Sequence, residues 1–197
     1  MNVGDCFLAL KKLKEKTVNY AGNYIIYNHK KWVKWKRKRL YENIIQDCGV
    51  SKEGIAAVRK TWEPVYKDKE NSGVFLFQVL FELHPDFEKY FARFKSEGAK
   101  SLFDNPMFLF HVKHKVMDSL NEVIDNLEND ERLLKILKSV ASNHKKRNIK
   151  KEEFVTLGKV VLETLRRALG TAMNPEVEDA WTKVIDCAMS AIGKVTG

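Results

Sequence analysis

The sequence is poor in residues that interrupt helices, and it lacks the patterns that mark strands and membrane spans. Its 197 residues include only four prolines, and no segment alternates apolar and polar residues as a half-buried strand does. No apolar run approaches the roughly 20 residues that a helix needs to cross a bilayer. The first residues do not place a basic segment before an apolar one, as a secretory signal does. We therefore expect an all-α, cytoplasmic protein.

Cysteine is also scarce. The three cysteines, Cys6, Cys48 and Cys187, are scattered along the chain. Their spacing is typical neither of a metal site nor of a disulfide framework. We therefore expect reduced thiols, as in most intracellular proteins.

Acidic residues are rare at the start of the chain. Residues 1–49 carry eleven basic and four acidic side chains, which gives this segment +7 of the total charge of +9. We predict a basic extension at 1–49, partly disordered or helical, and one folded domain at 50–197. The stretch "NHKKWVKWKRKRLY" at 28–41 has two interpretations, a solvated tail or a contact with an acidic protein or an anionic membrane surface. No nucleic-acid reading motif accompanies the charge, so no specific nucleic-acid partner is expected.

Apolar residues recur at helical spacing throughout residues 50–197. Ser51 is a suitable N-cap for the first helix, and Pro64 is expected to bend or end it. The next apolar stripe ends at "HPDF", because a residue that precedes proline avoids the helical region. "DNP" at 104–106 opens a helix that we expect to run to about Leu127. Three further stripes follow, and the predicted fold class is all-α.

One of these stripes ends on a histidine. In "LKSVASNH", Leu137, Val140 and His144 share a helix face, and the chain then turns abruptly cationic in "KKRN". A histidine in such a position is more often a core residue than a ligand. A neutral imidazole among aromatic and aliphatic side chains nevertheless suits axial ligation of haem iron.

The order of motifs from Gly49 onward resembles the globin family. "LKSVASNH" resembles the helix that carries the proximal histidine, and "HPDFEKYFARF" at 84–94 resembles the turn that places a phenylalanine against the haem. "VRKTWEPV" is similar to the first globin helix, "NPMFLFH" to the entry of the distal helix and "AWTKVIDCAM" to the last helix. The resemblance covers about 148 of 197 residues. Nerve-type invertebrate globins, neuroglobin and cytoglobin look most similar.

The resemblance implies about seven to eight helices around one haem b, with His144 as the proximal ligand. The second ring nitrogen of His144 would bond to the carbonyl of Val140, one turn back. The other residues that the resemblance places around the haem are Phe91, Phe94, Val112, Val116, Leu137, Val140, Ile149, Phe154 and Leu157.

The distal helix departs from the family pattern. A distal histidine and the aliphatic residue that faces iron with it are usually four positions apart, whereas His111 and Val116 are five apart. In a regular helix, Val112 and Val116 would share the haem face and His111 would point sideways. One extra residue absorbed in a π-bulge would bring His111 back to that face. His111 and Val112 thus both remain candidates, and His114 is expected on the solvated side.

Three functional classes remain open. The one we favour is a bis-histidyl haem protein in redox or gas sensing and electron transfer, with an unknown redox partner. The second is a five-coordinate globin that stores or delivers oxygen. The third is an enzyme, a nitric oxide dioxygenase or a nitrite reductase, which would need a separate reductant because the chain has no flavin or nicotinamide domain. O2, CO and NO are the expected small ligands.

Overall fold

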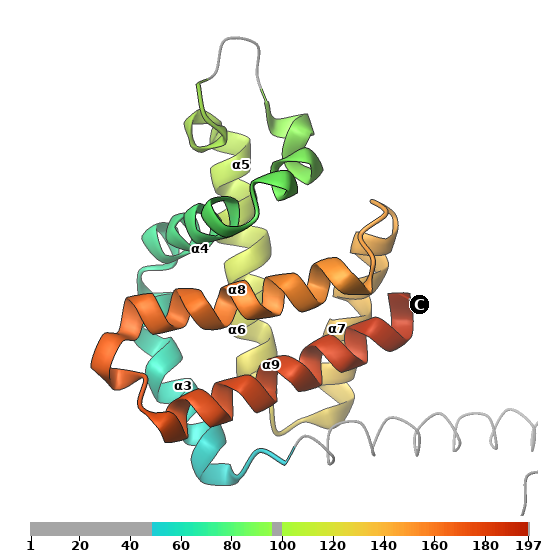
Figure 1. The fold of residues 1–197 in the computed structure, drawn as a ribbon. Helices are drawn as coiled ribbons and strands as arrows, with labels where there is room; N and C mark the ends of the chain where they lie inside the picture. The colour runs from blue at the N-terminus through green and yellow to red at the C-terminus, as the bar shows by residue number, and fades with distance from the viewer. Residues whose placement is uncertain (1–48, 96–99, 197) are drawn as a thin grey trace, which may run out of the picture. The chain divides into compact units, whose positions relative to one another are not determined.

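The computed structural model describes residues 49–95 and 100–196, with side chains described up to residue 193. Over these residues the chain is helical throughout and contains no strand, which confirms the all-α prediction (Figure 1). Its helical segments are α3 (Lys52–Lys67), α4 (Lys69–Leu83), η1 (Pro85–Phe94), η2 (Leu102–Asp104), α5 (Pro106–His111), η3 (Val112–Met117), α6 (Asp118–Asp125), α7 (Asp130–Lys145), α8 (Lys151–Leu169), η4 (Gly170–Ala172) and α9 (Pro175–Thr196).

The chain divides into two compact units, Met1–Asn43 and Ile44–Gly197. The first unit, and with it nearly all of the expected basic extension at 1–49, lies outside the described residues. The boundary at Gly49 and the proposed acidic or membrane contact of the extension therefore stay predictions. None of the described helices is both long and apolar enough to cross a membrane.

Short polar side chains start the helices where the sequence places them. The Ser51 hydroxyl accepts a hydrogen bond from the Gly54 amide at 3.0 Å. The Asn105 side chain accepts from the amides of Met107 and Phe108, with Pro106 in the first turn of α5. These side chains satisfy amides that have no partner within the first turn of a helix. The elements therefore begin where local chemistry stabilises them.

Pro64 does not end the first helix. α3 continues for one more turn to Lys67, and the Asp68 amide bonds back to the Pro64 carbonyl at 3.4 Å. A proline removes only its own N–H bond and crowds the carbonyl four residues earlier. Here the exposed position of Pro64 lets α3 absorb that loss, and the chain turns into α4 only after Asp68.

The core lies where α3, α4, α6 and α7 meet the long C-terminal helices. α8 and α9 run side by side across the molecule (Figure 1). Trp62 and Trp181 pack with ring centroids 6.1 Å apart, and the Trp181 indole donates to the Thr61 hydroxyl at 3.0 Å. The Trp62 indole donates to Asn121 at 2.9 Å. The two indoles thus join α3 to α9 and α6 while their polar atoms stay satisfied.

The expectation of three reduced cysteines is wrong for Cys187, which is disulfide-bonded. Spacing along the sequence reveals only pairs that are close in the chain or repeat in a known pattern. Cys187 lies in the last helix, so its partner is remote in sequence and only the fold can bring the two together.

Candidate functional site

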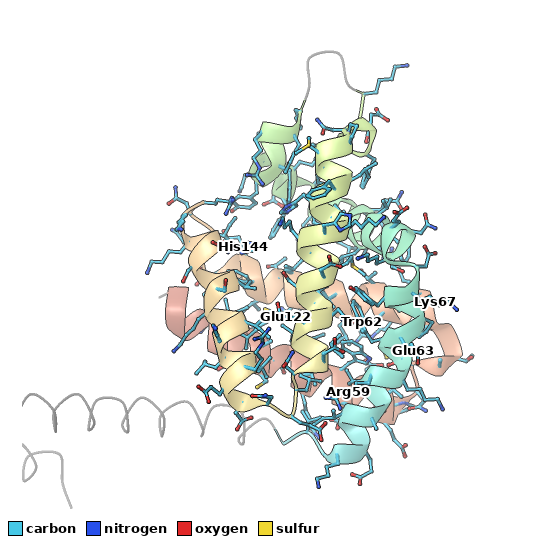
Figure 2. The ribbon with its side chains drawn as sticks, turned by 180° about the vertical axis from the view of Figure 1, so that it is seen from behind. Arg59, Trp62, Glu63, Lys67, Glu122 and His144 are labelled. Atoms are coloured by element: carbon cyan, nitrogen blue, oxygen red, sulfur yellow. The ribbon has the colours of Figure 1, made fainter. Side chains whose placement is uncertain are left out.

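His144 lies in the last turn of α7, and the way this helix ends fixes its position (Figure 2). The amides of Arg147 and Ile149 both donate to the His144 carbonyl, at 2.8 and 3.2 Å. Asn148 stops the helix in the left-handed region with φ of 57°, a conformation that asparagine tolerates better than most residues. The cationic sequence that follows His144 is therefore the tight turn that leads into α8.

The His144 ring is held in one tautomer. Its Nδ1 lies 2.8 Å from the Val140 carbonyl oxygen, as the sequence predicted. A carbonyl can only accept a hydrogen bond, so Nδ1 carries the proton and Nε2 keeps its lone pair. The Phe154 ring meets the imidazole edge to face, with centroids 5.1 Å apart. Burial lowers the pKa of His144, which favours the neutral imidazole that a metal ion requires.

The distal segment contains a bulge. Residues Val112–Met117 form a π-helical turn between α5 and α6, which is the distortion that the His111 alternative requires. Contacts with α4 hold the turn in place. Lys113 pairs with Glu70, and Lys69 reaches Asp118 at 2.7 Å. Because π-helical hydrogen bonds span five residues, residues five apart return toward the same face.

Val112 packs toward α4 and is only 1% exposed. Its Cγ1 and the Met117 side chain close around Gly73, where an added Cβ would lie 2.6 Å from Val112 Cγ1. Such a close approach requires glycine at residue 73. The Val112 side chain therefore packs against the interior side of α4.

His111 packs on the aromatic residues of η1. Its ring centroid lies 6.2 Å from that of Phe91 and 5.6 Å from that of Phe94. The ring nitrogens have no hydrogen-bond partner among residues 49–95 and 100–193. Burial, followed by the positive charges of Arg93, His144, Arg147 and Lys115, lowers the pKa of His111 to about 4. The His111 imidazole is therefore neutral near pH 7, with an uncommitted lone pair.

Phe108 is the aromatic residue around which this side of the site is built. It is fully buried, and its ring lies 5.3 Å from Phe77, 5.7 Å from Phe91 and 5.7 Å from Phe94, centroid to centroid. Its role as a support was missed from the sequence. Its spacing of three residues from His111 placed both on one side of α5 and could have revealed it.

A hydrogen bond links η1, which carries Phe91 beside His111, to α8, which carries Phe154 beside His144. The Tyr90 hydroxyl donates to Glu153 Oε1 at 2.8 Å, and Glu153 Oε2 accepts from the Lys150 amide at the start of α8. Tyr90 precedes Phe91, and Glu153 precedes Phe154. Burial and the Glu153 carboxylate raise the pKa of Tyr90 to about 12. This pair could not be recognised from the sequence, because its members are 63 residues apart.

The remaining predicted residues differ in exposure. Leu137 and Phe154 are buried, whereas Val116, Val140, Ile149 and Leu157 are half-buried. His114 is half-buried rather than solvated, since its ring lies 4.7 Å from the Phe110 ring and its Nδ1 lies 3.6 Å from Asp118. No group of three or more histidine, cysteine and acidic residues that could hold a bare metal ion occurs among the described side chains. The site thus offers two neutral imidazoles within an aromatic and aliphatic lining.

Comparison with known proteins identifies this arrangement. The model of the family described as Globin matches residues 74–192, more than half of the chain. The chain belongs to the globin family. Among solved structures, the fold of this globin is similar to that of a hexacoordinated haem protein from an anhydrobiotic tardigrade, with a TM-score of 0.68 and 20% sequence identity. That match covers 77% of this globin and 97% of the tardigrade chain.

Sequence relatives of this globin include cytoglobins and a neuroglobin. Cytoglobin-1 of Oryzias latipes is 28% identical over 145 residues, which cover 71% of this globin and 81% of the relative. Neuroglobin of Dissostichus mawsoni is 27% identical over 146 residues, covering 74% and 91%. The resemblance expected from the motif order is confirmed.

Proposed function

We propose that this globin binds one haem b between His144 and His111, and that both histidines ligate the iron when no external ligand is bound. When bound, haem supplies a one-electron redox centre and a coordination position for small gases. We assign His144 as the proximal ligand through Nε2, with the Val140 carbonyl fixing its tautomer. Phe91, Phe94 and Phe154 would pack against the porphyrin.

The observed donors suit this group. Both imidazoles are kept neutral by burial, and neither commits its ligating nitrogen to a protein hydrogen bond. Three exposed cations act electrostatically on His111, namely Arg93, Lys115 and Arg147. Their positive charges would favour the anionic propionate groups of haem. The apolar lining would exclude water from the ligating nitrogens.

The π-helical turn supports the choice of His111 over Val112 as the distal residue. Val112 fills the space beside Gly73 in α4, whereas His111 lies on Phe91 and Phe94, the two residues expected against the haem. The different packing of these two adjacent side chains is the observation that carries the proposal. It replaces the regular-helix geometry in which Val112 would face the iron.

A bis-histidyl site favours redox and gas-sensing roles over bulk oxygen transport. Iron held by two protein ligands changes oxidation state without gaining or losing a ligand, which suits electron transfer. O2, CO or NO would have to displace the His111 imidazole. Their apparent affinity is therefore reduced in proportion to the small fraction of molecules in which His111 has left the iron. Oxygen storage is the alternative, and the lack of a hydrogen bond to the His111 ring favours it, because nothing but packing would resist outward rotation of that ring.

The test is the visible spectrum of the ferrous protein without added ligand. We expect the wild type to be low-spin and six-coordinate. His111→Leu should give a five-coordinate, high-spin spectrum. It should also bind carbon monoxide about 10 to 1,000 times faster, as expected if the open form is a ~0.1–10% minor state.

His114→Leu is the matched control, because His114 lies three residues after His111, within the π-helical turn Val112–Met117. This variant should keep the wild-type spectrum and rate. His144→Ala should no longer retain haem through gel filtration. A wild-type ferrous protein that is high-spin and binds carbon monoxide in one step would contradict bis-histidyl ligation. Full haem retention by His144→Ala would contradict the proximal assignment.

A further inference from the structure

The turn between α7 and α8 gathers positive charge next to His144 (Figure 1). Residues 50–197 carry only +2 of the total charge of +9, since residues 1–49 account for +7. No acidic residue lies among residues 145–151. Five exposed basic side chains of this segment form a surface that we call the basic turn: Lys145, Lys146, Arg147, Lys150 and Lys151.

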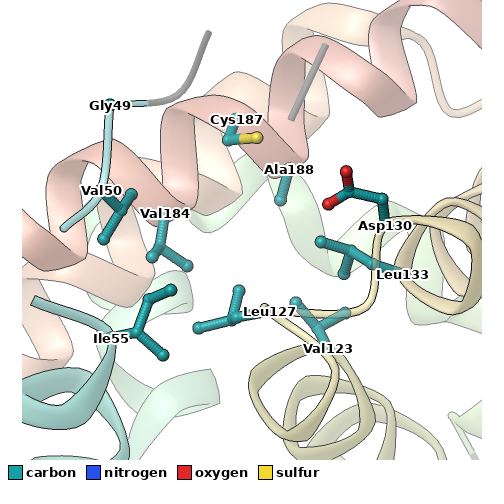
Figure 3. A pocket seen from close by; sticks show the side chains of 10 residues that line it. All are labelled: Gly49, Val50, Ile55, Val123, Leu127, Asp130, Leu133, Val184, Cys187 and Ala188. Carbon is teal, nitrogen blue, oxygen red and sulfur yellow. The ribbon is translucent and has the colours of Figure 1, made fainter. Parts of the chain in front are cut away.

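The opposite end of α7 has a different chemical character. Asp130 and Glu131 occupy the first turn of this helix. Asp130 and Leu133 line a cavity of about 210 Å³, and the other walls of this cavity, from α3, α6 and α9, are mostly aliphatic (Figure 3). None of the described residues that line it is basic. The excess of positive charge therefore lies at the end of α7 that carries His144.

The basic turn has no charge partner within the described fold. Exposed cations elsewhere pair with carboxylates, as Arg167 does with Glu82 at 2.9 Å. No side chain of the basic turn forms an ion pair with a carboxylate among residues 49–95 and 100–193. Glu153, which follows the turn, accepts instead from Tyr90 and from the Lys150 amide. The positive charges thus remain available to an external anion.

The stability of the helices does not account for all of these cations. Positive charge at the end of α7 is favoured by the negative end of the helix dipole. Lys150 and Lys151, however, are the N-cap and the first residue of α8, where the dipole favours carboxylates. A lysine ammonium also offers no acceptor to the amides of the first turn. Two lysines at this helix start therefore indicate a role other than stabilising the helix.

The backbone holds the basic turn firmly beside the proximal histidine. The turn begins at the residue after His144, and the amides of Arg147 and Ile149 both donate to the His144 carbonyl. Arg147 Nη1 also donates to the Asn143 carbonyl at 2.6 Å. The charge of Arg147 acts electrostatically on both His144 and His111. A protein bound to the basic turn would thus lie close to both candidate iron ligands.

We propose that the basic turn is the docking surface for an acidic protein that delivers one electron to the haem bound at His144. This inference rests on the haem site proposed above and names its partner class. Contacts between redox proteins are typically small and transient, and complementary charge mainly raises the rate of encounter. In the transfer, the reduced cofactor of the donor loses one electron and ferric iron becomes ferrous. No atom is transferred.

The residues around the basic turn favour a protein over a membrane or a nucleic acid. Membrane-surface sites combine cations with exposed tryptophan, phenylalanine or leucine, and single strands of nucleic acid stack on aromatic rings. Residues 142–153 include no aromatic side chain, and Phe154 is buried. Val155 is 38% exposed and lies one helical turn after Lys151. An aliphatic contact with a polar rim is typical of a protein interface.

The first test is cross-linking of the full-length protein to oxidised flavodoxin, a small acidic electron-transfer protein, at low salt. A carbodiimide joins a lysine amine directly to a carboxylate that it contacts. Mass spectrometry should locate the linked amines at Lys145, Lys146 and Lys150. Links confined to residues 1–49 or to α3 would overturn the proposal. This measurement involves no electron transfer, so it stays decisive even if the ferrous spectrum contradicts bis-histidyl ligation.

The second test is the rate at which fully reduced flavodoxin reduces the ferric globin, followed by stopped flow. Lys145→Gln, Lys146→Gln and Lys150→Gln combined should react about 5 to 50 times more slowly at ~10 mM ionic strength, because three exposed charge pairs are lost. The difference should nearly vanish at ~1 M salt, where the Debye length is about 3 Å. Free reduced riboflavin is uncharged and should reduce this variant and the wild type equally. Arg147 is kept because it acts on both histidines.

The matched control removes the same charge from α3, which Figure 2 shows on the side of the fold opposite His144. It combines Lys52→Gln, Lys60→Gln and Lys67→Gln, three exposed lysines. This control should keep the cross-links at the basic turn and a rate close to wild type.

Equal slowing in both variants would show that net charge alone sets the rate, and would overturn the docking surface. The basic-turn variant could also lose binding to vesicles of phosphatidylcholine and phosphatidylserine in equal parts, or to single-stranded DNA, with its flavodoxin rate unchanged. That result would overturn the proposal in favour of a membrane or a nucleic acid.

Discussion

Tyr90 connects two segments that flank the candidate haem site. Its hydroxyl donates to Glu153 at 2.8 Å, and its neighbour Phe91 contacts His111 while Phe154, next to Glu153, contacts His144. The hydrogen bond from Tyr90 is the main cause that lowers the pKa of Glu153. Because the pKa of this carboxyl is lower in the folded protein than in the unfolded chain, the contact stabilises the native state at pH values above the ordinary glutamate pKa. The stabilisation is lost as the pH falls through the lowered value.

Tyr90→Phe should therefore weaken the fold at neutral pH and speed the loss of haem. We expect an unfolding temperature about 2–4 °C lower at pH 7, the consequence of one lost hydrogen bond worth ~1 kcal/mol. The difference from wild type should shrink as the pH falls below 4.5, where Glu153 protonates in the unfolded chain. Transfer of haem to an excess of apomyoglobin measures the rate of haem loss, which should rise severalfold.

Tyr66→Phe serves as the control for this variant. Tyr66 also donates its hydroxyl to a carboxylate, Asp118 at 3.0 Å, but it joins α3 to the start of α6. The control should lower stability to a similar extent and leave haem transfer near the wild-type rate. Equal acceleration in both variants would mean that general destabilisation, rather than the link between the two segments, controls haem loss.

Some residues of the site could be predicted from the sequence, and others could not. His144 and its Val140 acceptor followed from helix periodicity, since both lie on one stripe that the helix repeat dictates. Phe91 and Phe94 followed from a local motif. The orientation of Val112 and the Tyr90–Glu153 bond did not, because each depends on an element that is remote in the chain. Periodicity describes the face of a helix but not which neighbour covers it.

At the scale of elements, the π-helical turn is the feature that orients the distal segment. The sequence pointed to this place only as a conflict, because a family motif and the helix repeat favoured distal residues one position apart, and a bulge was one way to resolve it. The protein contacts that stabilise it could not be predicted. Gly73 in α4 receives Val112 and Met117, and any Cβ at residue 73 would meet Val112 Cγ1 at 2.6 Å. Valine cannot easily relieve this contact, because its branched side chain has few rotamers in a helix.

Gly73→Ala should displace the π-helical turn. Overpacking in a tight core costs about 1–3 kcal/mol, and the better helix propensity of alanine returns up to ~1 kcal/mol. We expect a net loss in the free energy of unfolding of about 1–2 kcal/mol, measured by urea denaturation. The low-spin fraction of the ferrous spectrum should also fall, because a shift of Val112 moves its neighbour His111.

Gln78→Ala gives the matched comparison, since Gln78 lies on the exposed side of the same helix. It should leave both stability and spectrum close to wild type. A Gly73→Ala protein that is as stable as wild type with an unchanged spectrum would show that the turn does not depend on the close packing of α4.

The order and approximate bounds of the elements were largely predictable. Capping residues such as Ser51 and Asn105, and the breaks at prolines that precede helices, are local signals that the fold reproduces. Pro64 shows the limit of such signals. A proline at an exposed position in the last turns of a helix costs one hydrogen bond, and packing of Val58 and Trp62 on the same helix outweighs that loss.

At the scale of the whole molecule, charge is divided unevenly along the chain. Residues 1–49 carry +7 of the net charge of +9. The described residues begin at Gly49 and already include every residue assigned to the haem. Removal of the basic segment should therefore change electrostatic contacts, which weaken with salt, without changing the haem environment.

Two truncated proteins, one starting at Ile44 and one at Gly49, separate these contributions. Both should bind haem and give the ferrous spectrum of the full-length protein, because both retain every residue assigned to the haem. If the protein starting at Gly49 cannot retain haem while the one starting at Ile44 can, residues 44–48 belong to the globin core. Loss of haem from both would place the basic extension itself within the folded domain.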